Sequence, residues 1–308
     1  MPELPEVESV RRGLIKHTVG QQIASAESFG ARVSRRSVRE LSSVAGTTVT
    51  GVARRGKFLW FDLEMSGSGA DGSAAGDTDV SGQGAGPGHS ALVAHLGMSG
   101  QFRVDCDGLP HVRARLMLSN GLRLEFIDQR TFGYLAPDDY EETDDGAPGG
   151  LGIDRPVVPQ LAAHIARDLL DPGLDRVALA VTMASKRTAI KKLLLDQSVI
   201  SGIGNIYADE ALYDACIHPF RPANSLSGPE MSRLLSGATD VLERSLAAGG
   251  TSFDSLYVHV NGESGYFERS LRAYGRGGTP CPRCGTEFLK VMSGGRSSTF
   301  CPQCQGLR

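Results

Sequence analysis

The sequence lacks several features that would place it in a specialised class of protein. No apolar run approaches the ~20 residues that cross a bilayer, so we expect no membrane partner. The N-terminus also lacks a basic leader followed by an apolar stretch, which is the pattern of a secretory signal. These absences predict a cytoplasmic protein, and its 308 residues are enough for two or three compact units.

An excess of positive charge is missing as well. The formal net charge is −3, which at first argues against a polyanionic partner. The acids are concentrated, however, because three lie in 66–90 and six in 137–150, and neither stretch contains Lys or Arg. Without those nine charges the rest of the chain carries +6, and residues 265–308 alone carry +5. A basic C-terminal unit fits a phosphate backbone, although a solvated basic face explains the charge about as well.

The first half of the chain has the pattern of a β-sandwich that carries one helix, and we assign it to residues 1–136. Residues 5–18 repeat apolar side chains at helical spacing, and Pro5 suits a first helical turn. Short β-like runs follow, and a tight turn joins the last two as a hairpin: 47–54, 57–63, 91–96, 101–104, 112–118 and 121–127.

The second half changes to helical periodicity. Residues 66–90, rich in Gly, Ser, Ala and Asp, predict a disordered insertion in the first unit, and the acidic stretch 137–158 predicts an interdomain hinge. A helical unit then covers 159–249, with these runs: 159–170, 174–183, 187–196, 205–214 and 229–247. Residues 250–308 return to Gly-rich turns and short strands, so we predict a multidomain α+β protein.

Cysteine spacing in the last unit predicts a metal site. Four of the six cysteines form two C-x2-C pairs that are sixteen residues apart: Cys281, Cys284, Cys301 and Cys304. Their thiolates can close a tetrahedral Zn²⁺ site, whereas two disulfides are disfavoured in a reducing cytoplasm. Because protein fills all four positions, we expect one structural zinc. Lys290 and Arg296 lie between the pairs, where they suit a phosphate or are simply exposed basic residues.

In the helical unit the stretch VISGIGN, residues 199–205, separates two helical patterns. Gly202 and Gly204 permit tight turns, and Asn205 is placed to cap the second helix. The N-terminus of such a helix is a phosphate site, although a Gly-x-Gly alone is more often a plain connection. Four nearby cations favour contact with a DNA backbone: Lys186, Arg187, Lys191 and Lys192.

Three loops of the β-rich unit carry further candidates. Lys57 opens one strand, and His95 ends another, just before the loop with Met98. Met98, Arg130 and Phe132 on loops can fill the gap left when a nucleotide leaves a duplex. Core packing is the alternative for Met98 and Phe132, and it is the usual fate of both residue types.

The N-terminal segment MPELPEVE contains a candidate nucleophile. Removal of Met1 would expose Pro2 as a secondary amine, and a pKa near ~8 leaves a usable fraction of an α-amino group neutral. Attack of that amine on a sugar C1′ gives an iminium, which acidifies the C2′ proton. Glu3 is placed for proton transfer at the sugar, and Glu6 for orienting it. The alternative is that both acids only complement the helix dipole.

Together these segments resemble the formamidopyrimidine-DNA glycosylase family of bacterial base-excision repair enzymes. The resemblance covers nearly the whole chain and rests on the following motifs: MPELPEVE, RRGKFLW, HLGMSG, DQRTFG, SGIGNIYADEALY, GGTSFDS, GYFERSLRAYGR and the CPRC and CPQC pairs. It implies an N-terminal β-sandwich with a catalytic helix, a helix–two-turns–helix domain at 159–249, and a lesion loop and β-hairpin zinc finger within 250–308.

The resemblance also implies a role for each matched residue. The nucleophile and its adjacent glutamate correspond to Pro2 and Glu3, the second glutamate to Glu6, and the strand lysine to Lys57. The remaining correspondences concern DNA and zinc, with Met98, Arg130 and Phe132 as void fillers, His95, Asn205 and Arg296 at phosphates, and the four cysteines as ligands. Many members read DPRRFG where this chain has DQRTFG, so Thr131 replaces a second arginine.

The implied activity is excision of 8-oxoguanine and formamidopyrimidines from duplex DNA, followed by β- and δ-elimination at the abasic site. We expect a monomer that acts on nucleoid DNA. The endonuclease eight type, which prefers oxidised pyrimidines, begins with PEGPE rather than PELPE, so this chain resembles the purine branch. A catalytically silent DNA-binding protein is disfavoured because Pro2, Glu3 and Lys57 are all present. The ranking of lesions stays open, since it depends on a loop expected near 250–264.

Overall fold

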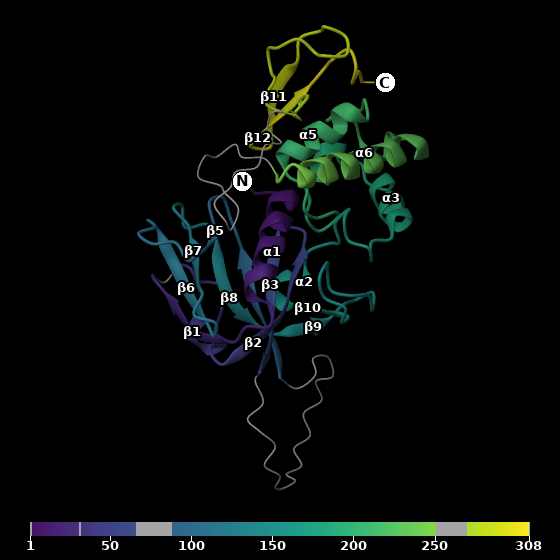
Figure 1. Cartoon of the computed structure of the whole chain (residues 1–308). Coiled ribbons are helices and arrows are strands. Elements are labelled where there is room, and N and C mark those ends of the chain that lie inside the picture. Colours follow the sequence, from purple (N-terminus) through teal and green to yellow (C-terminus); the bar gives the residue numbers. More distant parts are fainter. Residues whose placement is uncertain (1, 31, 66–87, 251–269, 308) are drawn as a thin grey trace.

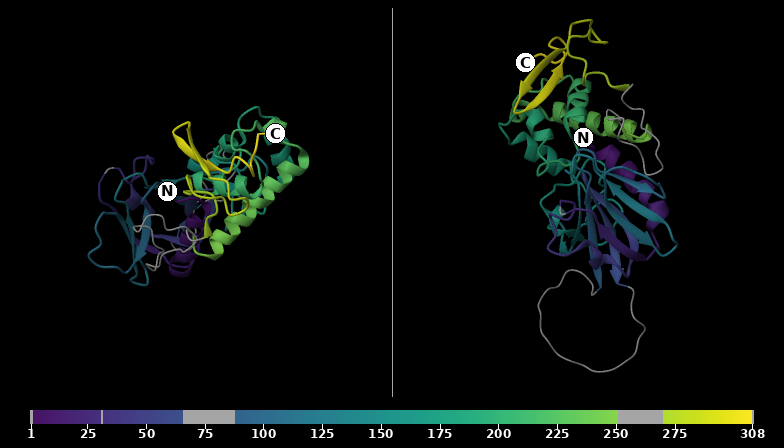
Figure 2. Two further views of the ribbon diagram at one scale, coloured as in Figure 1. Left: turned by 90° about the horizontal axis from the view of Figure 1, so that it is seen from above. Right: turned by 90° about the vertical axis from the view of Figure 1, so that its left-hand side faces the viewer.

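A computed structural model describes residues 2–30, 32–65, 88–250 and 270–307 of the chain. A β-rich lobe, a helical lobe and a small hairpin module follow one another along the molecule, and the N-terminus lies where the first two lobes meet (Figure 1). Figure 2 shows the same arrangement from two other directions. Most of the predicted insertion (66–87) and of the predicted lesion loop (251–264) lies outside the described residues. His89 and Ser90, which we expected in the insertion, begin strand β4.

The β-rich lobe is the predicted sandwich of two antiparallel sheets, with strand orders β1-β6-β7-β5 and β2-β3-β4-β8. The strands and the short 3-10 helix η1 have these bounds: β1 Ile23–Ser28, η1 Leu41–Val44, β2 Thr47–Arg55, β3 Phe58–Met65, β4 His89–His95, β5 Gln101–Val104, β6 Val112–Leu118, β7 Arg123–Ile127 and β8 Tyr134–Asp138. Phe61 of one sheet meets Phe102 of the other, with ring centroids 5.8 Å apart, in a core of aliphatic side chains. The start of β3 and the end of β4 lie at the edge of the sandwich that faces the helical lobe.

Helix α1 (Leu4–Thr18) confirms the helix predicted over 5–18. Pro5 lies in its first turn, and a capping box closes its start, because the Glu3 N–H donates to Glu6 Oε2 at 2.8 Å. Val10 and Leu14 are buried in the sandwich core, so this face fixes the helix to the β-rich lobe. The start of α1 is thereby presented to the helical lobe.

A buried ionic network ties the β-rich lobe to the chain that follows it. Arg54 has no exposed surface, and its guanidinium donates to Asp168 Oδ2 at 2.7 Å and to Glu8 Oε2 at 3.1 Å. Asp168 Oδ2 also accepts the Gly56 N–H at 2.9 Å. Removing one partner of such a buried network leaves an uncompensated charge, which costs about 3–5 kcal/mol. The network fixes the β2–β3 turn, and therefore the start of β3 where Lys57 lies.

The acidic stretch predicted as a hinge contains a small antiparallel sheet of β9 (Tyr140–Glu142) and β10 (Val157–Pro159). Helix α2 (Gln160–Ala163) is much shorter than the helix predicted over 159–170, which is therefore wrong for most of its length. The Asp168 carboxylate accepts the Leu170 N–H at 3.0 Å, and such a local bond competes with helical hydrogen bonding. Residues after α2 form turns that bring Asp168 to Arg54.

The helical lobe contains α3 (Arg176–Ala184), α4 (Ile190–Leu194), α5 (Asn205–Asp214), the 3-10 helix η2 (Ala223–Ser225) and α6 (Gly228–Ala247). The hairpin module consists of β11 (Leu289–Ser293) and β12 (Arg296–Phe300) with the four cysteines beside it. Within the described parts of the chain, no helix combines the length and the apolar character that a membrane crossing needs.

Candidate active site

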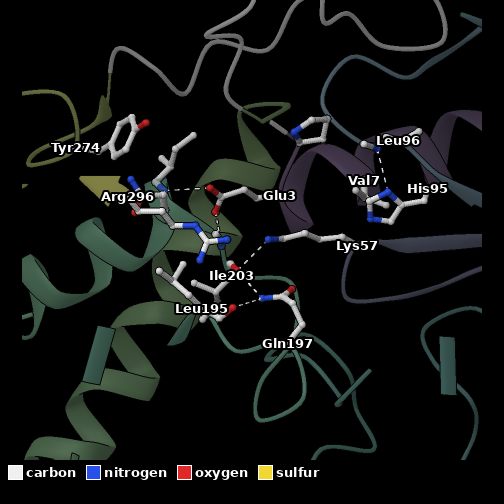
Figure 3. A pocket seen from close by; sticks show the side chains of 15 residues that line it. Glu3, Val7, Lys57, His95, Leu96, Leu195, Gln197, Ile203, Tyr274 and Arg296 are labelled. Carbon is white, nitrogen blue, oxygen red and sulfur yellow. Dashed lines mark hydrogen bonds between the residues drawn. The ribbon is translucent and has the colours of Figure 1, made fainter. Parts of the chain in front are cut away.

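A cavity of about 270 Å³ opens where α1, the start of β3, the end of β4, the start of α5 and β12 come together (Figure 3). Seven of the residues singled out from the sequence line it: Pro2, Glu3, Lys57, His95, Gly204, Asn205 and Arg296. They come from segments as far apart in the chain as Pro2 and Arg296, so the fold assembles the cavity from both lobes and the hairpin. Pro2 is buried in its wall, and Met1 lies outside the described residues.

Glu3 is the best-defined acid in the cavity. Its side chain is buried, and its carboxylate accepts backbone N–H groups at the start of α5, from Gly204 at 2.6 Å and Ile206 at 3.0 Å. Burial raises the pKa of Glu3 to about 7, against the opposing effect of the nearby Lys57 charge. A carboxyl with this pKa exchanges a proton near neutral pH, as a general acid or base requires.

The start of α5 differs from the sequence prediction. We expected Asn205 to cap this helix and its free N–H groups to hold a phosphate, but the N-cap is Gly204 and the anion at these groups is the Glu3 carboxylate. A Cβ at Gly204 would overlap the Glu3 carboxyl, so glycine is required here for close approach. Asn205 still lines the cavity, with its side-chain oxygen buried and unpaired.

Lys57 reaches into the cavity from the start of β3, and its Nζ donates to the Ile203 carbonyl at 3.0 Å. Burial lowers the pKa of Lys57, and the charge of Arg296 lowers it further, while Glu3 acts in the opposite direction. Gln197, which the sequence reasoning missed, donates to the same carbonyl at 3.0 Å and accepts the Gly202 N–H at 3.0 Å. Gln197 therefore fixes the turn before α5 against which Lys57 is placed.

Glu6 acts on the backbone of Glu3 rather than on its carboxylate. Its Oε2 accepts the Glu3 N–H, and its Oε1 accepts the Tyr207 hydroxyl proton at 2.7 Å. Tyr207 in turn contacts Ser245 Oγ of α6 at 2.5 Å. Tyr207 and Ser245 were not predicted, since nothing local in the sequence distinguishes them from core residues. Together they anchor the first turn of α1 to the helical lobe.

His95 is held as a neutral imidazole that can donate a hydrogen bond. Its Nδ1 accepts the Gly97 N–H at 3.1 Å, which leaves the proton on Nε2. Burial, helped by the charge of Lys57, lowers the pKa of His95 to about 4. Its ring stacks on Tyr134, with centroids 5.6 Å apart, and lies edge-on to Phe58 at 5.0 Å. An Nε2–H donor held in this way suits a phosphate oxygen.

Met98, Arg130 and Phe132 stand on two loops outside the cavity. Met98 is 36% exposed and Phe132 54% exposed, so the alternative of core packing is wrong for both. We call residues 128–133 the wedge loop. Ser99 Oγ donates to Asp128 Oδ1 at 2.5 Å and accepts the Arg130 N–H at 3.0 Å, which joins the Met98 loop to the wedge loop. Ser99 and Asp128 are further residues that the sequence reasoning did not identify.

The four cysteines of the hairpin module fit one zinc ion. Their sulfur atoms all lie within 4.8 Å of one another, with Cys281 and Cys304 3.9 Å apart and Cys284 and Cys301 3.5 Å apart. Zn–S bonds of about 2.3 Å in a tetrahedron place sulfurs about 3.8 Å apart, so the set matches a zinc site with four thiolate ligands. The remaining cysteines, Cys106 and Cys216, are half-buried and exposed.

Lys191 does not lie on a DNA-facing surface, which corrects the prediction made for it. Its side chain is only 5% exposed and pairs with Asp209 at 2.6 Å, because burial of this cation requires a counter-charge. Lys191 also donates to the Ser297 carbonyl at 2.7 Å, and Asp209 accepts the Thr299 N–H at 3.0 Å. This pair fixes β12, and with it Arg296 at the cavity. Lys290 lies on exposed β11 and is not part of the cavity lining.

Comparison with known proteins gives the same assignment along the whole chain. Residues 1–135 match the model of the formamidopyrimidine-DNA glycosylase N-terminal domain, 165–256 that of its H2TH domain, and 278–306 that of the zinc finger found in FPG and IleRS. The formamidopyrimidine-DNA glycosylase of Rhodococcus jostii is 46% identical, with 99% of this chain and 96% of the relative covered. That of Corynebacterium jeikeium is 47% identical, with 99% and 100% covered.

Solved structures agree with this. The MutM (FPG) protein from Thermus thermophilus is 33% identical with a TM-score of 0.76, and both chains are fully covered. A Lactococcus lactis FPG mutant, solved in complex with a Fapy-dG containing DNA, is 28% identical with a TM-score of 0.76, with 99% of this chain and 100% of that chain covered. The chain belongs to the formamidopyrimidine-DNA glycosylase family.

Proposed function

We propose that this protein is a bifunctional DNA glycosylase and abasic-site lyase that excises oxidised purines from duplex DNA. The observation that carries the proposal is the single cavity in which Pro2, Glu3 and Lys57 meet Arg296 of the hairpin module. Relatives that match over the full chain bear the glycosylase name, and related structures contain Fapy-dG, carbocyclic 8-oxo-G or an abasic site in DNA. Chromosomal DNA in the cytoplasm is the corresponding substrate.

The reaction begins at Pro2, whose nitrogen becomes a secondary amine once Met1 is removed. The neutral amine attacks C1′ of the damaged nucleotide, the N-glycosidic bond breaks with its electron pair going to the base, and the proton lost from the amine nitrogen neutralises the departing base. Glu3 donates a proton to the sugar ring oxygen, the ring opens, and an iminium forms between Pro2 and C1′. With a pKa of about 7, Glu3 is protonated in a large fraction of molecules before this step and ionised after it.

The iminium then draws electrons from the neighbouring carbon. Loss of the C2′ proton expels the 3′ phosphate, and a second elimination, with loss of another sugar proton, expels the 5′ phosphate and leaves a one-nucleoside gap. Water then hydrolyses the iminium, which frees the sugar fragment and restores the Pro2 amine. Because Glu3 is ionised after ring opening and lies next to Pro2, it is the base available at the sugar. The reaction uses no redox step and no metal chemistry from the zinc, which organises the hairpin module when bound.

The other cavity residues position the substrate. Lys57, Arg296 and the Nε2–H of His95 hold phosphates next to the damaged nucleotide, and Asn205 adds a donor at the start of α5. Met98, Arg130 and Phe132 fill the space that the everted nucleotide leaves in the duplex, with Arg130 facing the opposite base. Glu6 orients Glu3 through its backbone, and Lys290 adds charge to the DNA-binding face of the hairpin module.

The direct test is incubation of the full-length protein with a duplex that contains one 8-oxoguanine opposite cytosine. We expect free 8-oxoguanine and a gap that carries phosphate at both ends, and no cleavage of the same duplex with guanine. A matched duplex with an oxidised pyrimidine should be cut more slowly. Cleavage of the pyrimidine duplex alone, or binding without cleavage of any lesion, would contradict the proposal.

A further inference from the structure

The wedge loop is held from outside by one arginine of the 32–39 segment. The guanidinium of Arg35 donates to three successive carbonyls of the loop, to Phe132 at 2.7 Å and to Thr131 and Gly133 at 3.1 Å each. It also donates to the Arg32 carbonyl at 2.8 Å, which ties it to its own segment. The planar guanidinium reaches these carbonyls from two nitrogens, Nη1 for Thr131 and Gly133 and Nη2 for Phe132, whereas a lysine has a single nitrogen at the end of its side chain.

The carbonyls that Arg35 binds belong to a strained turn. Thr131 has φ +56°, the left-handed region that is unfavourable for a side chain branched at Cβ. Strained residues of this kind persist only where the surroundings over-determine the backbone, and they concentrate at functional sites. Asp128 holds the same turn from the inside by accepting the Gly133 N–H at 2.6 Å. Arg35 and Asp128 therefore hydrogen-bond to the backbone of the turn from opposite sides.

Arg35 also connects the wedge loop with the cavity. Its guanidinium carbon lies 5.7 Å from the centroid of the Tyr134 ring, and Tyr134 stacks on His95. One guanidinium thus touches the segment that carries Arg130 and Phe132 and the aromatic ring that supports a phosphate donor. DNA bound over this surface would exclude water, which strengthens charge-assisted hydrogen bonds.

We propose that Arg35 is a positioning residue that sets the discrimination of the base opposite the lesion, by fixing Arg130 and Phe132 through the backbone of the wedge loop. The proposal rests on the proposed function of the cavity. Where relatives with DPRRFG carry a second arginine, this chain has Thr131, and the rigidity of the turn comes from Arg35. Without Arg35, the turn relaxes, and Arg130 and Phe132 enter the duplex in several arrangements.

The test compares Arg35→Met with Arg36→Met in the full-length protein. Arg36 is the neighbouring exposed arginine and forms no hydrogen bond within the described part of the chain, so it controls for loss of one charge. We expect Arg35→Met to lower single-turnover excision of 8-oxoguanine opposite cytosine on the order of tenfold, and to reduce the preference for cytosine over adenine. Cleavage of a preformed abasic site should change by less than about threefold in both variants.

Two further measurements separate positioning from general destabilisation. Adding Arg35→Met to the double variant Arg130→Ala/Phe132→Ala should slow excision no further, because Arg35 acts through these two side chains. Arg35→Lys should behave as Arg35→Met, since a single ammonium nitrogen does not reproduce the fork of two nitrogens by which Arg35 holds the turn. Equal effects of Arg35→Met and Arg36→Met, a further loss when Arg35→Met is added to Arg130→Ala/Phe132→Ala, or full rescue by Arg35→Lys would each overturn the proposal.

A binding experiment tests the role of Arg35 independently of base excision. A duplex with a stable abasic analogue opposite 2-aminopurine reports insertion of the wedge, because an unstacked 2-aminopurine fluoresces. We expect a smaller fluorescence rise with Arg35→Met than with wild type or Arg36→Met at saturating protein. If wild type excises no oxidised purine, the proposed function fails, and this signal still decides the role of Arg35. An unchanged signal in Arg35→Met would overturn that role.

Discussion

The pKa of Glu3 makes a quantitative prediction about stability. Burial raises it from 4.5 to about 7, so the folded protein binds a proton that the unfolded chain has released between these pH values. Stability from this group is therefore fully present below pH 4.5 and is lost as the pH rises through 7. A pKa difference of one between the two states corresponds to about 1.36 kcal/mol, so between pH 5 and 8 the contribution of Glu3 to the free energy of unfolding should fall by about 2 to 3 kcal/mol.

Glu3→Gln removes the titrating group from the same position. The glutamine keeps an uncharged oxygen acceptor at the start of α5, so the contribution of position 3 in the variant does not change with pH. The difference in unfolding free energy between Glu3→Gln and wild type should therefore rise by about 2 to 3 kcal/mol, in favour of the variant, from pH 5 to 8. Urea denaturation at each pH measures the difference, and a ¹³C-carboxyl titration of Glu3 gives its pKa directly.

Glu8 provides a matched control on the same helix. It is also buried, but Arg11 and Arg54 outweigh the effect of burial and lower its pKa to about 2. It is therefore ionised in both the folded and the unfolded protein above about pH 6, and the curve of Glu8→Gln should run parallel to wild type from there to pH 8. If the curve of Glu3→Gln were also parallel to wild type, Glu3 would be ionised throughout and the assignment of proton transfer to it would fail.

Two other substitutions test the parts of the DNA-binding surface separately. Cys284→Ser should release zinc and weaken DNA binding together, because the hairpin that carries Arg296 depends on the metal. Metal analysis measures the zinc content, and a binding titration measures the affinity for DNA. Full affinity without zinc would contradict a structural role for the metal. Arg130→Ala should lower excision opposite cytosine roughly tenfold or more and affect preformed abasic sites much less, since it removes a base contact. Equal losses on the two substrates would count against its contact with the opposite base.

Features that depend on a single short stretch of the chain were predicted correctly from the sequence. The apolar spacing and Pro5 predict α1, and two C-x2-C pairs predict a zinc site that the four sulfur positions fit. Contiguous motifs likewise allowed Pro2, Lys57 and Arg296 to be singled out before their meeting in one cavity was known. In each case the signal lies within a short stretch, where residue type and spacing constrain the answer.

Features that depend on distant partners could not be predicted. The Glu3 carboxylate occupies the start of α5, about 200 positions along the chain, so Asn205 appeared to be the cap and the helix appeared free for phosphate. Lys191 looked like a DNA contact because its pairing with Asp209 and β12 is tertiary. The helix predicted beyond α2 failed for the same reason, since Asp168 faces a buried Arg54. Residue type alone does not tell which polar group a fold will bury.

The central claim is that the nitrogen of Pro2 attacks the sugar. Borohydride reduction during reaction with a duplex that contains 8-oxoguanine opposite cytosine tests it most directly, because reduction fixes the iminium as a stable bond. We predict a covalent adduct that peptide mass spectrometry places on Pro2, and its loss in Pro2→Gly with Met1 removed. Absence of an adduct, an adduct on Lys57, or equal trapping by Pro2→Gly would contradict the mechanism.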